Sequence, residues 1–453
     1  MIVFRRRLIF WLIKAYIKKS KKIILFSFLF GLIAFSVLLF GSRYFSKLIP
    51  TTKKVTVGVI GAYRQDNLPP VVVNYLSRGL TMVKEDGSIK PDLASSWDIT
   101  DKGKTYTFHL NKNEYFRDGK EVTSDSIAYN FSDVVVEKPD KYTLVFKIKE
   151  TYSPFLVTVS RPVFKKGFVG VGNYQIEDIK LNGNFIQSMA IVSVKDKFDR
   201  KQFIFYPTEE ALKTAFLLGE ITEANGIDAD NLKNLSFDKF PNMNVTKGST
   251  YSRLVALFFN TTDGVLSDEK LRLGLSYAIP NDFKEGYRAH LPYSPKSIFY
   301  NVDVPVKEQD YEHARLLLSS SDTASDSAQT LSLTIKTLRK YKPTAESIAA
   351  SWKKVGVETK IEEVDGIPNQ FQIFLGDFNL AKDPDQYTLW HSEQPNNITN
   401  YKNLRIDKLL EDGRKTVDID ERKQIYADFQ KYLVDDVPAI FLYFPTEYRL
   451  VRK

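Results

Sequence analysis

The feature that most constrains this chain is an uncharged apolar segment near its N-terminus. Residues 23–40, IILFSFLFGLIAFSVLLF, contain no charged side chain, and Gly41 and Ser42 extend the segment. At a rise of about 1.5 Å per residue, a helix of this length nearly spans a hydrocarbon core of about 30 Å. We therefore expect one N-terminal transmembrane helix, residues 23–42, with the folded part of the chain on one side of a membrane.

The basic residues around this segment predict its orientation. Residues 1–54 hold twelve Lys or Arg and no Asp or Glu, and eight of the twelve precede the apolar run. Because positive charge is retained in the cytoplasm, residues 1–22 are expected to be a basic cytoplasmic N-terminus. Residues 43–54 then form a linker, and the protein is expected to be a single-pass protein of the plasma membrane with an extracytoplasmic binding domain.

A cleaved signal peptide is the competing interpretation of the same segment. The apolar region of a signal peptide is usually shorter, about 7–15 residues, and ends in a small-residue cleavage site. Here the residues that follow, GSRYFSKLIP, are bulky and basic, and the chain has no cysteine that could accept a lipid. These features favour an anchor that is not removed.

The net charge of +9 belongs to the N-terminus. Subtracting its twelve basic residues from the total of 64 leaves 52 against 55 acidic residues, a net of −3 for residues 55–453. The folded part therefore has no excess of basic residues for a nucleic-acid interface, and we expect no nucleic-acid partner. The absence of cysteine also excludes disulfides and thiol chemistry.

One stretch, YTFHLNKNEYFRDGKEVTSDSIAYNF, combines three local signals. Apolar and polar residues alternate over 106–110, which predicts a half-buried strand. The Asp-Gly pair at 118–119 indicates a turn. Thr123 or Ser124 is expected to cap a helix that carries an apolar face as far as Phe131.

From about residue 253 the pattern becomes an alternation of helices and strands, which implies an α/β sheet covered on both faces. The expected helices are 267–279 with Ser267 as N-cap, 344–356 ending at Gly356, and the capped segment 418–436; an earlier helix begins at Glu209. The expected strands are 55–60, 142–148, 203–206, 357–364, 371–375 and 439–444. The polar run 319–329 is predicted to be a loop.

Residues with potential chemistry are scattered. The four histidines are far apart in the sequence and lack metal-ligand spacing, and no phosphate-binding loop or nucleophile elbow occurs. Asp383 and Asp385 flank a proline, which is more typical of a turn than of paired catalytic carboxylates. For Tyr387 and Trp390, stacking on a ligand and packing in a core are both open interpretations.

Taken in order along the chain, the motifs resemble those of family 5 extracellular solute-binding proteins, the peptide- and nickel-binding receptors of ABC importers. The similarity covers about residues 55–447. The segments that carry it are IKPDLASSWDITDKGKTYTFHL, the following FRDG turn, VGVGNY, TEEALKTAFLLGEITEANGI, FFNTTDGVLSDEKLRLGLSYAI, YEHARLLL, VGVETKIEEVD, DPDQY and VDDVPAIFLYF.

The resemblance implies a two-lobed, periplasmic-binding-protein-like α/β fold with a ligand cleft between the lobes. The implied parts are a first lobe over 55–252 with a small sub-domain at about 85–165, a second lobe over 253–438, and a return strand to the first lobe within 439–453. The hinge is expected near 250–256 and 437–444. A protein of this kind captures oligopeptides or a similar small solute and delivers them to an ABC transporter permease, without catalysis, cofactor or metal.

The resemblance also implies which residues wall the cleft. By position in the family's motifs they are Asn260, Asp377, Phe378, Asp383, Tyr387 and Trp390. Peptide-binding members carry an aspartate that binds the peptide's amino group at the position occupied here by Leu380. Asp377 either replaces that anchor or is a solvated loop residue, and the sequence leaves both interpretations open.

Two other functions remain as alternatives. The missing amine anchor and the uncleaved tether suit a sensor or scaffold that kept the fold without transport. An extracytoplasmic hydrolase would use Asp383 and Asp385 as paired acids. Because a fold does not fix a function, these alternatives have to be judged at the site.

Overall fold

The computed structural model describes residues 2–48, 53–229, 231–232, 235–321 and 331–453. The chain forms two units, Met1–Lys54 with Asp196–Arg200, and Val55–Lys195 with Lys201–Lys453. The N-terminal helices belong to the first unit, and every feature of the site described below belongs to the second.

The N-terminal unit contains two helices, α1 (Ile2–Lys19) and α2 (Lys21–Leu48). Within the described residues, neither helix alone has both the length and the hydropathy needed to cross a membrane. Ile9–Lys19 and Lys21–Val37 meet these requirements only as a pair, with a bend of 80° between them. The single transmembrane helix expected at residues 23–42 therefore stays a prediction.

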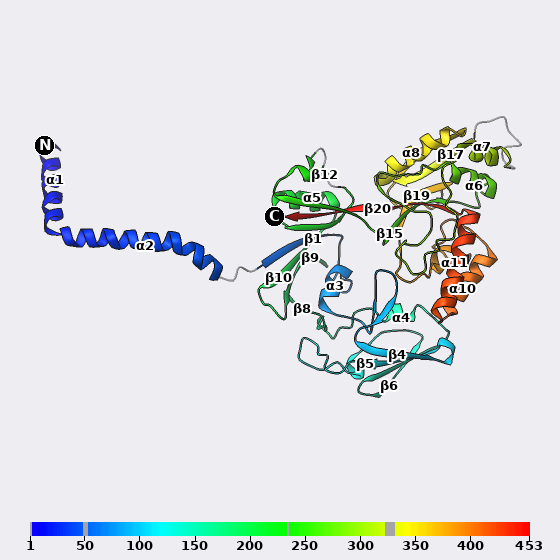
Figure 1. The fold of residues 1–453 in the computed structure, drawn as a ribbon, viewed down its shortest axis with the longest axis horizontal. Helices are drawn as coiled ribbons and strands as arrows, with labels where there is room; N and C mark the ends of the chain where they lie inside the picture. The colour runs from blue at the N-terminus through cyan, green and yellow to red at the C-terminus, as the bar shows by residue number, and fades with distance from the viewer. Residues whose placement is uncertain (1, 49–52, 230, 233–234, 322–330) are drawn as a thin grey trace. The chain divides into compact units, whose positions relative to one another are not determined.

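A twelve-stranded mixed sheet runs through the second unit (Figure 1). Its path is β18-β17-β19-β15-β20-β11-β1-β10-β9-β8, and β14 and β16 also pair with β20. The strands are β1 (Lys53–Ile60), β8 (Tyr174–Asn182), β9 (Phe185–Ser193), β10 (Asp199–Tyr206), β11 (Glu223–Ile227), β14 (Met243–Ser249), β15 (Arg253–Phe259), β16 (Gly286–Arg288), β17 (Leu331–Leu338), β18 (Val357–Val364), β19 (Ile373–Asn379) and β20 (Ala439–Arg452).

Strand β20 joins two groups of strands. Its first part pairs with β15 and β16, from Ala439 to Pro445. Its second part, from Thr446 to Arg452, pairs with β14 and, over part of that length, with β11. The chain also passes between the groups where β14 leads into β15, so two segments connect them, residues 250–252 and the change of partners at Pro445 and Thr446. The hinge expected near 250–256 and 437–444 stays a prediction. The lobe boundaries themselves stay a prediction.

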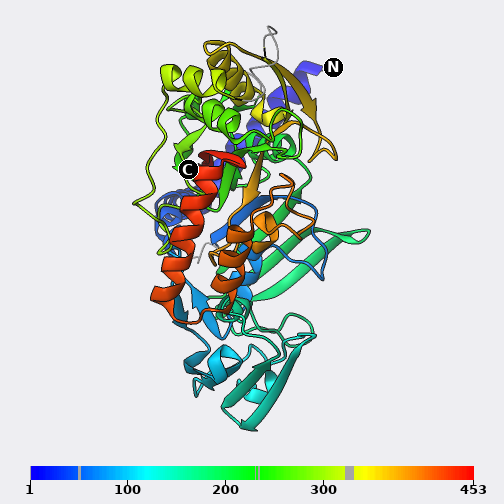
Figure 2. The same ribbon diagram turned by 90° about the vertical axis from the view of Figure 1, so that its right-hand side faces the viewer.

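Strand β15 is buried on both faces, because its side chains alternate between two cores. Val255, Leu257 and Phe259 pack with α6 (Glu269–Tyr277), α7 (Tyr311–Ser319) and α8 (Lys342–Lys353). Leu254, Ala256 and Phe258 pack with α9 (Tyr387–Trp390), α10 (Leu404–Lys415) and α11 (Ile419–Asp436). Figures 1 and 2 show the two helix layers on either side of these strands. The expected sheet with helices on both faces is confirmed.

A separate four-stranded sheet forms the small sub-domain, in the order β4-β5-β7-β6. Its strands are β4 (Ala94–Thr100), β5 (Thr105–Leu110), β6 (Val134–Asp140) and β7 (Thr143–Ile148). Phe108 and Phe146 meet edge to face at 5.7 Å in its core. Strands β5 and β7 confirm the strands predicted at 106–110 and 142–148, and they pair antiparallel with each other.

The remaining short elements connect these sheets. They are α3 (Pro70–Leu76), β2 (Thr81–Val83), β3 (Ile89–Pro91), α4 (Phe155–Thr158), α5 (Glu209–Leu218), β12 (Asn231–Leu232) and β13 (Leu235–Ser236). Helix α5 begins at Glu209, as predicted. Gly356 has a φ of +85° and ends the α8 segment, also as predicted. The loop predicted at 319–329 falls largely outside the described residues.

Two local predictions were wrong. The helix expected after Thr123 is only a 3-10 turn, Ser124–Ser126, because Ile127 is already extended. Tyr129 and Phe131 beyond it stack at 5.5 Å and pack on the small core, so burial of aromatic rings overrides the helix signal. The N-cap of α6 is Asp268, whose carboxylate accepts two backbone N–H groups, and not Ser267.

His290 gives the fold a predicted pH dependence. Burial and the nearby Arg288 lower the pKa of His290 to about 4. The unfolded chain therefore binds the proton more readily, and the stability present above pH ~6.5 is lost as the pH falls toward about 4. We expect the free energy of unfolding to drop by about 1 kcal/mol between pH ~6.5 and ~5.5 from this group. Urea unfolding of the His290→Gln variant should lack that drop, and an unchanged slope would contradict the assignment.

Candidate functional site

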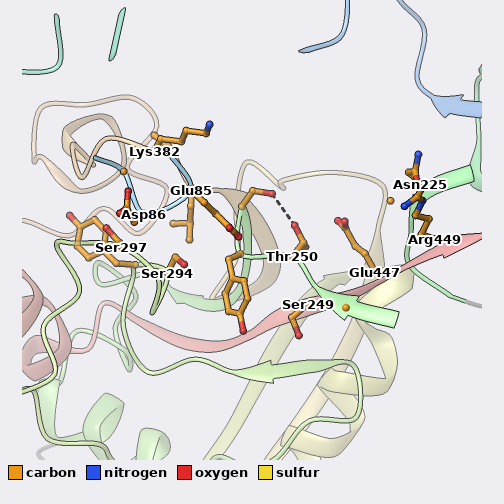
Figure 3. Close-up of a pocket in the computed structure, with 18 of the residues that line it drawn as sticks. Glu85, Asp86, Asn225, Ser249, Thr250, Ser294, Ser297, Lys382, Glu447 and Arg449 are labelled. Atoms are coloured by element: carbon orange, nitrogen blue, oxygen red, sulfur yellow. Dashed lines mark hydrogen bonds between the residues drawn. The ribbon is translucent and has the colours of Figure 1, made fainter. Parts of the chain in front are cut away.

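A cavity of about 600 Å³ lies in the second unit (Figure 3). Parts of the chain far apart in sequence surround it. They are the turn 85–87 between β2 and β3, residues 225–226 within β11, the segment 246–252 around the end of β14, residues 293–297, the loop 380–384 after β19, and residues 447–449 of β20. This is a volume that suits a small-molecule or short-peptide ligand.

The turn 85–87 closes one side of the cavity against residues that follow β16 and β19. Ile298 donates its backbone N–H to the Asp86 carbonyl at 2.9 Å, and Lys382 Nζ donates to the Val83 carbonyl at 3.1 Å. The ammonium of Lys296 pairs with the Glu85 carboxylate. These three contacts hold the small sub-domain side of the cavity to the opposite wall.

Gly87 allows this close approach. Its φ is +84°, and a Cβ built there would lie 2.8 Å from the Lys382 carbonyl oxygen. A side chain at residue 87 would therefore be strained and would push the two walls apart.

Asp383, which lines the cavity, is held by a buried ion pair. Arg422 donates two hydrogen bonds to the two carboxylate oxygens, at 2.7 and 3.0 Å, and both side chains are less than a tenth exposed. Burial lowers the pKa of Arg422, but the Asp383 charge outweighs this, so the pKa is raised. Asp385 is held similarly by Arg414 at 2.8 Å. Both aspartates therefore hold the turn in place, in line with the interpretation of the Asp-Pro-Asp motif as a turn.

The carboxylate of Asp377 is also engaged by cations of the protein. The alternation of β19 places it opposite Val255 of β15, on the face packed by α8. Its carboxylate lies 3.4 Å from Lys340 Nζ and 3.7 Å from Arg253 Nε. The same arginine pairs with Asp228 and lies 3.4 Å from Glu447. Asp377 is thus neither a solvated loop residue nor a free carboxylate.

The other expected wall residues lie away from the cavity. Asn260 follows the far end of β15, roughly 26 Å from Ser252 by strand rise. Its amide donates to the Phe371 carbonyl at 3.1 Å. Trp390 is 1% exposed and donates its indole N–H to Gln386, so it fills the core. Phe378 packs on Phe258. Tyr387 stacks on His391 at 4.2 Å.

Of the six wall residues expected from the family resemblance, only Asp383 lines the cavity in this structure. Sequence reasoning missed the turn 85–87, the segment 246–252 and Lys382. The Asp-Gly pair at 86–87 is a turn signal that was available. The other contributions depend on which distant segments meet, and no local pattern reports that. Whether the six residues contact a ligand stays a prediction.

The described residues hold no group of three or more His, Cys, Asp or Glu side chains placed to bind one metal ion. The polar groups of the cavity are hydroxyls, backbone amides and charged side chains. This arrangement binds a ligand by hydrogen bonds and charge, with shape supplied by the surrounding segments.

Two groups of strands that share β20, with a cavity beside their junction, define a binding protein of the periplasmic type. A sequence profile of the bacterial extracellular solute-binding proteins, family 5 Middle, matches residues 88–400. The chain belongs to this family.

Known proteins agree with this assignment. The oligopeptide-binding protein AppA of Bacillus subtilis is 25% identical over 85% of this chain and 84% of its own length. The structure of AppA from Bacillus subtilis in complex with a nonapeptide has a TM-score of 0.65 and 23% identity, covering 88% of this chain and 94% of that one. NikZ from Campylobacter jejuni in complex with Ni(L-His) has a TM-score of 0.70 and 22% identity, covering 89% and 94%. At these identities the solved structures establish the fold.

Proposed function

We propose that this protein is a membrane-anchored, extracytoplasmic solute-binding protein. It captures oligopeptides or a similar small solute in the cleft and delivers them to an ABC transporter permease. The family and its peptide-binding relatives support this role, and the relative that binds a nickel–histidine complex shows that other small solutes occur on the same fold.

One observation of the structure carries the proposal. The cavity of about 600 Å³ is closed on one side by the turn 85–87 and the end of β2, which touch the opposite wall through three separate contacts. Closure of two lobes around a ligand is how such receptors work. A ligand shifts the equilibrium toward the closed state only by its greater affinity for that state.

Mass spectrometry of the bound contents tests the proposal. The full chain is purified in detergent without dialysis and denatured, and the released small molecules are identified. A ladder of short peptides is the expected result. An empty cleft, together with no thermal shift from a peptide library, would contradict the proposal and favour the sensor or scaffold alternative.

We also propose that the N-terminal helices anchor the protein. The uncharged residues 23–40 lie in α2, and the eight basic residues that precede them favour a cytoplasmic N-terminus. Alkaline carbonate extraction of membranes should leave the protein in the pellet, and protease added to spheroplasts should digest the binding domain. Release of the protein by carbonate would contradict the anchor.

A further inference from the structure

The carboxylates that line the cavity are almost all engaged by cations of the protein itself. Asp383 pairs with Arg422, Glu85 with Lys296, and Glu447 lies 3.4 Å from Arg253. A carboxylate that already faces a cation attracts a ligand ammonium much less than a free one. Asp377, outside the cavity, is engaged in the same way.

Two of the lining cations are not engaged by acids. Arg449 pairs with Glu223 at 2.9 Å, but Lys247 and Lys382 form no ion pair within the part of the chain that the structure describes. Lys382 Nζ donates to the Val83 carbonyl, which uses one of the three donors of an ammonium group. Both side chains are exposed, so their remaining donors are available to a ligand.

We infer that the cleft recognises its ligand through an anionic group, bound by Lys382, with Lys247 as a second lining cation, and requires no ammonium on the ligand. For a peptide, this group is a carboxylate such as the C-terminal one. The inference rests on the proposed function and adds to it the sign of the ligand charge that the cleft recognises. A charge-assisted hydrogen bond from an ammonium to a carboxylate is among the stronger polar contacts available in such a cleft.

Asp86 is the one lining carboxylate of the described residues that no ion pair engages. Its Oδ1 accepts hydrogen bonds from the Ser88 backbone N–H at 2.8 Å and from the Ser88 hydroxyl at 2.6 Å, which hold the turn. Recognition of a ligand ammonium by Asp86 is therefore the alternative, and the experiment distinguishes it from recognition of an anionic group by Lys382.

The test compares three forms of one tripeptide library on the full chain in detergent: unmodified, N-acetylated and C-amidated. We expect acetylation to change the affinity by less than about twofold and amidation to weaken it by at least about tenfold, the usual range for losing a charge-assisted contact. Lys382→Met should weaken binding of the unmodified library by a similar factor, with little further loss on amidation. Lys431→Met, at an exposed lysine of α11 that does not line the cavity, is the matched control and should bind as the parent does.

Three other results would contradict the inference in distinguishable ways. If acetylation abolishes binding while amidation does not, and Asp86→Asn reproduces the loss, the site selects an ammonium through Asp86 and the proposed function stands. If none of the three forms binds, peptides fail as the solute of the proposed function, and the inference fails with them. Equal affinity of the parent and Lys382→Met for the unmodified library would remove Lys382 from the recognition of the ligand.

Discussion

Replacing Arg422 by Met is expected to lower the free energy of unfolding by about 3–5 kcal/mol, because the partner charge on Asp383 stays buried without compensation. Asp383 is 7% exposed and its two oxygens receive the two hydrogen bonds of Arg422. The backbone carbonyl of Gly413 would also lose the bond from Arg422 Nε, at 2.8 Å. Urea denaturation measures the change.

A double variant separates the cost of leaving one buried charge unpaired from the cost of losing the arginine side chain. Arg422→Met combined with Asp383→Leu removes both charges and should recover much of the lost stability, since replacing a buried pair by apolar groups is often neutral. Lys408→Met is the matched control, because Lys408 and Asp412 form an exposed pair, worth at most about 1 kcal/mol. Equal losses for Arg422→Met and Lys408→Met would contradict the structural role of the buried pair.

Gly87→Ala is expected to weaken ligand binding by about tenfold to a hundredfold, because the added Cβ opposes the contact that closes the cavity. The Cβ would lie 2.8 Å from the Lys382 carbonyl, a backbone atom that cannot move aside as the end of a side chain can. The cost falls on the state in which turn 85–87 touches the opposite wall, so affinity should suffer more than folding. Calorimetric titration with the peptides identified by mass spectrometry measures it.

Gly119→Ala is a closely matched control for this prediction. Gly119 has a φ of +79°, close to that of Gly87, but a Cβ there would meet nothing within 4 Å. Both substitutions therefore cost a similar amount of backbone strain, roughly 1 kcal/mol, and only one opposes closure. Equal affinities of the two variants would show that the contact of Gly87 with Lys382 plays no part in binding.

The strands of the large sheet and the helices that cover it were largely predictable, because their sequence patterns are local. Helix α11 appears where the capped amphipathic segment 418–436 predicted it, and the first part of β20 appears where the apolar run 439–444 predicted a strand. Strand β5 and its partner β7 were likewise found by alternation. The helix predicted after Thr123 does not form, because packing of aromatic side chains in the small core, which is not a local pattern, decides the conformation there.

The site was much less predictable than the fold. Asp377 and Arg253 are far apart in the sequence, and nothing local indicates that their charges meet. The same holds for Lys296 and Glu85, which join the two sides of the cavity. The family resemblance placed the groove on the segments that follow β15 and β19. In this structure the loop 380–384 after β19 lines the cavity, and the segment after β15 does not.

The central claim is that the cleft closes around a peptide, and a distance measurement tests it most directly. The chain has no cysteine, so spin labels attach only at Lys120→Cys in the small sub-domain and Lys408→Cys in α10. Both positions are exposed. Double electron–electron resonance should show a shorter and narrower distance distribution when saturating peptide is added. An unchanged distribution, with peptide binding verified on the same labelled sample, would contradict the account.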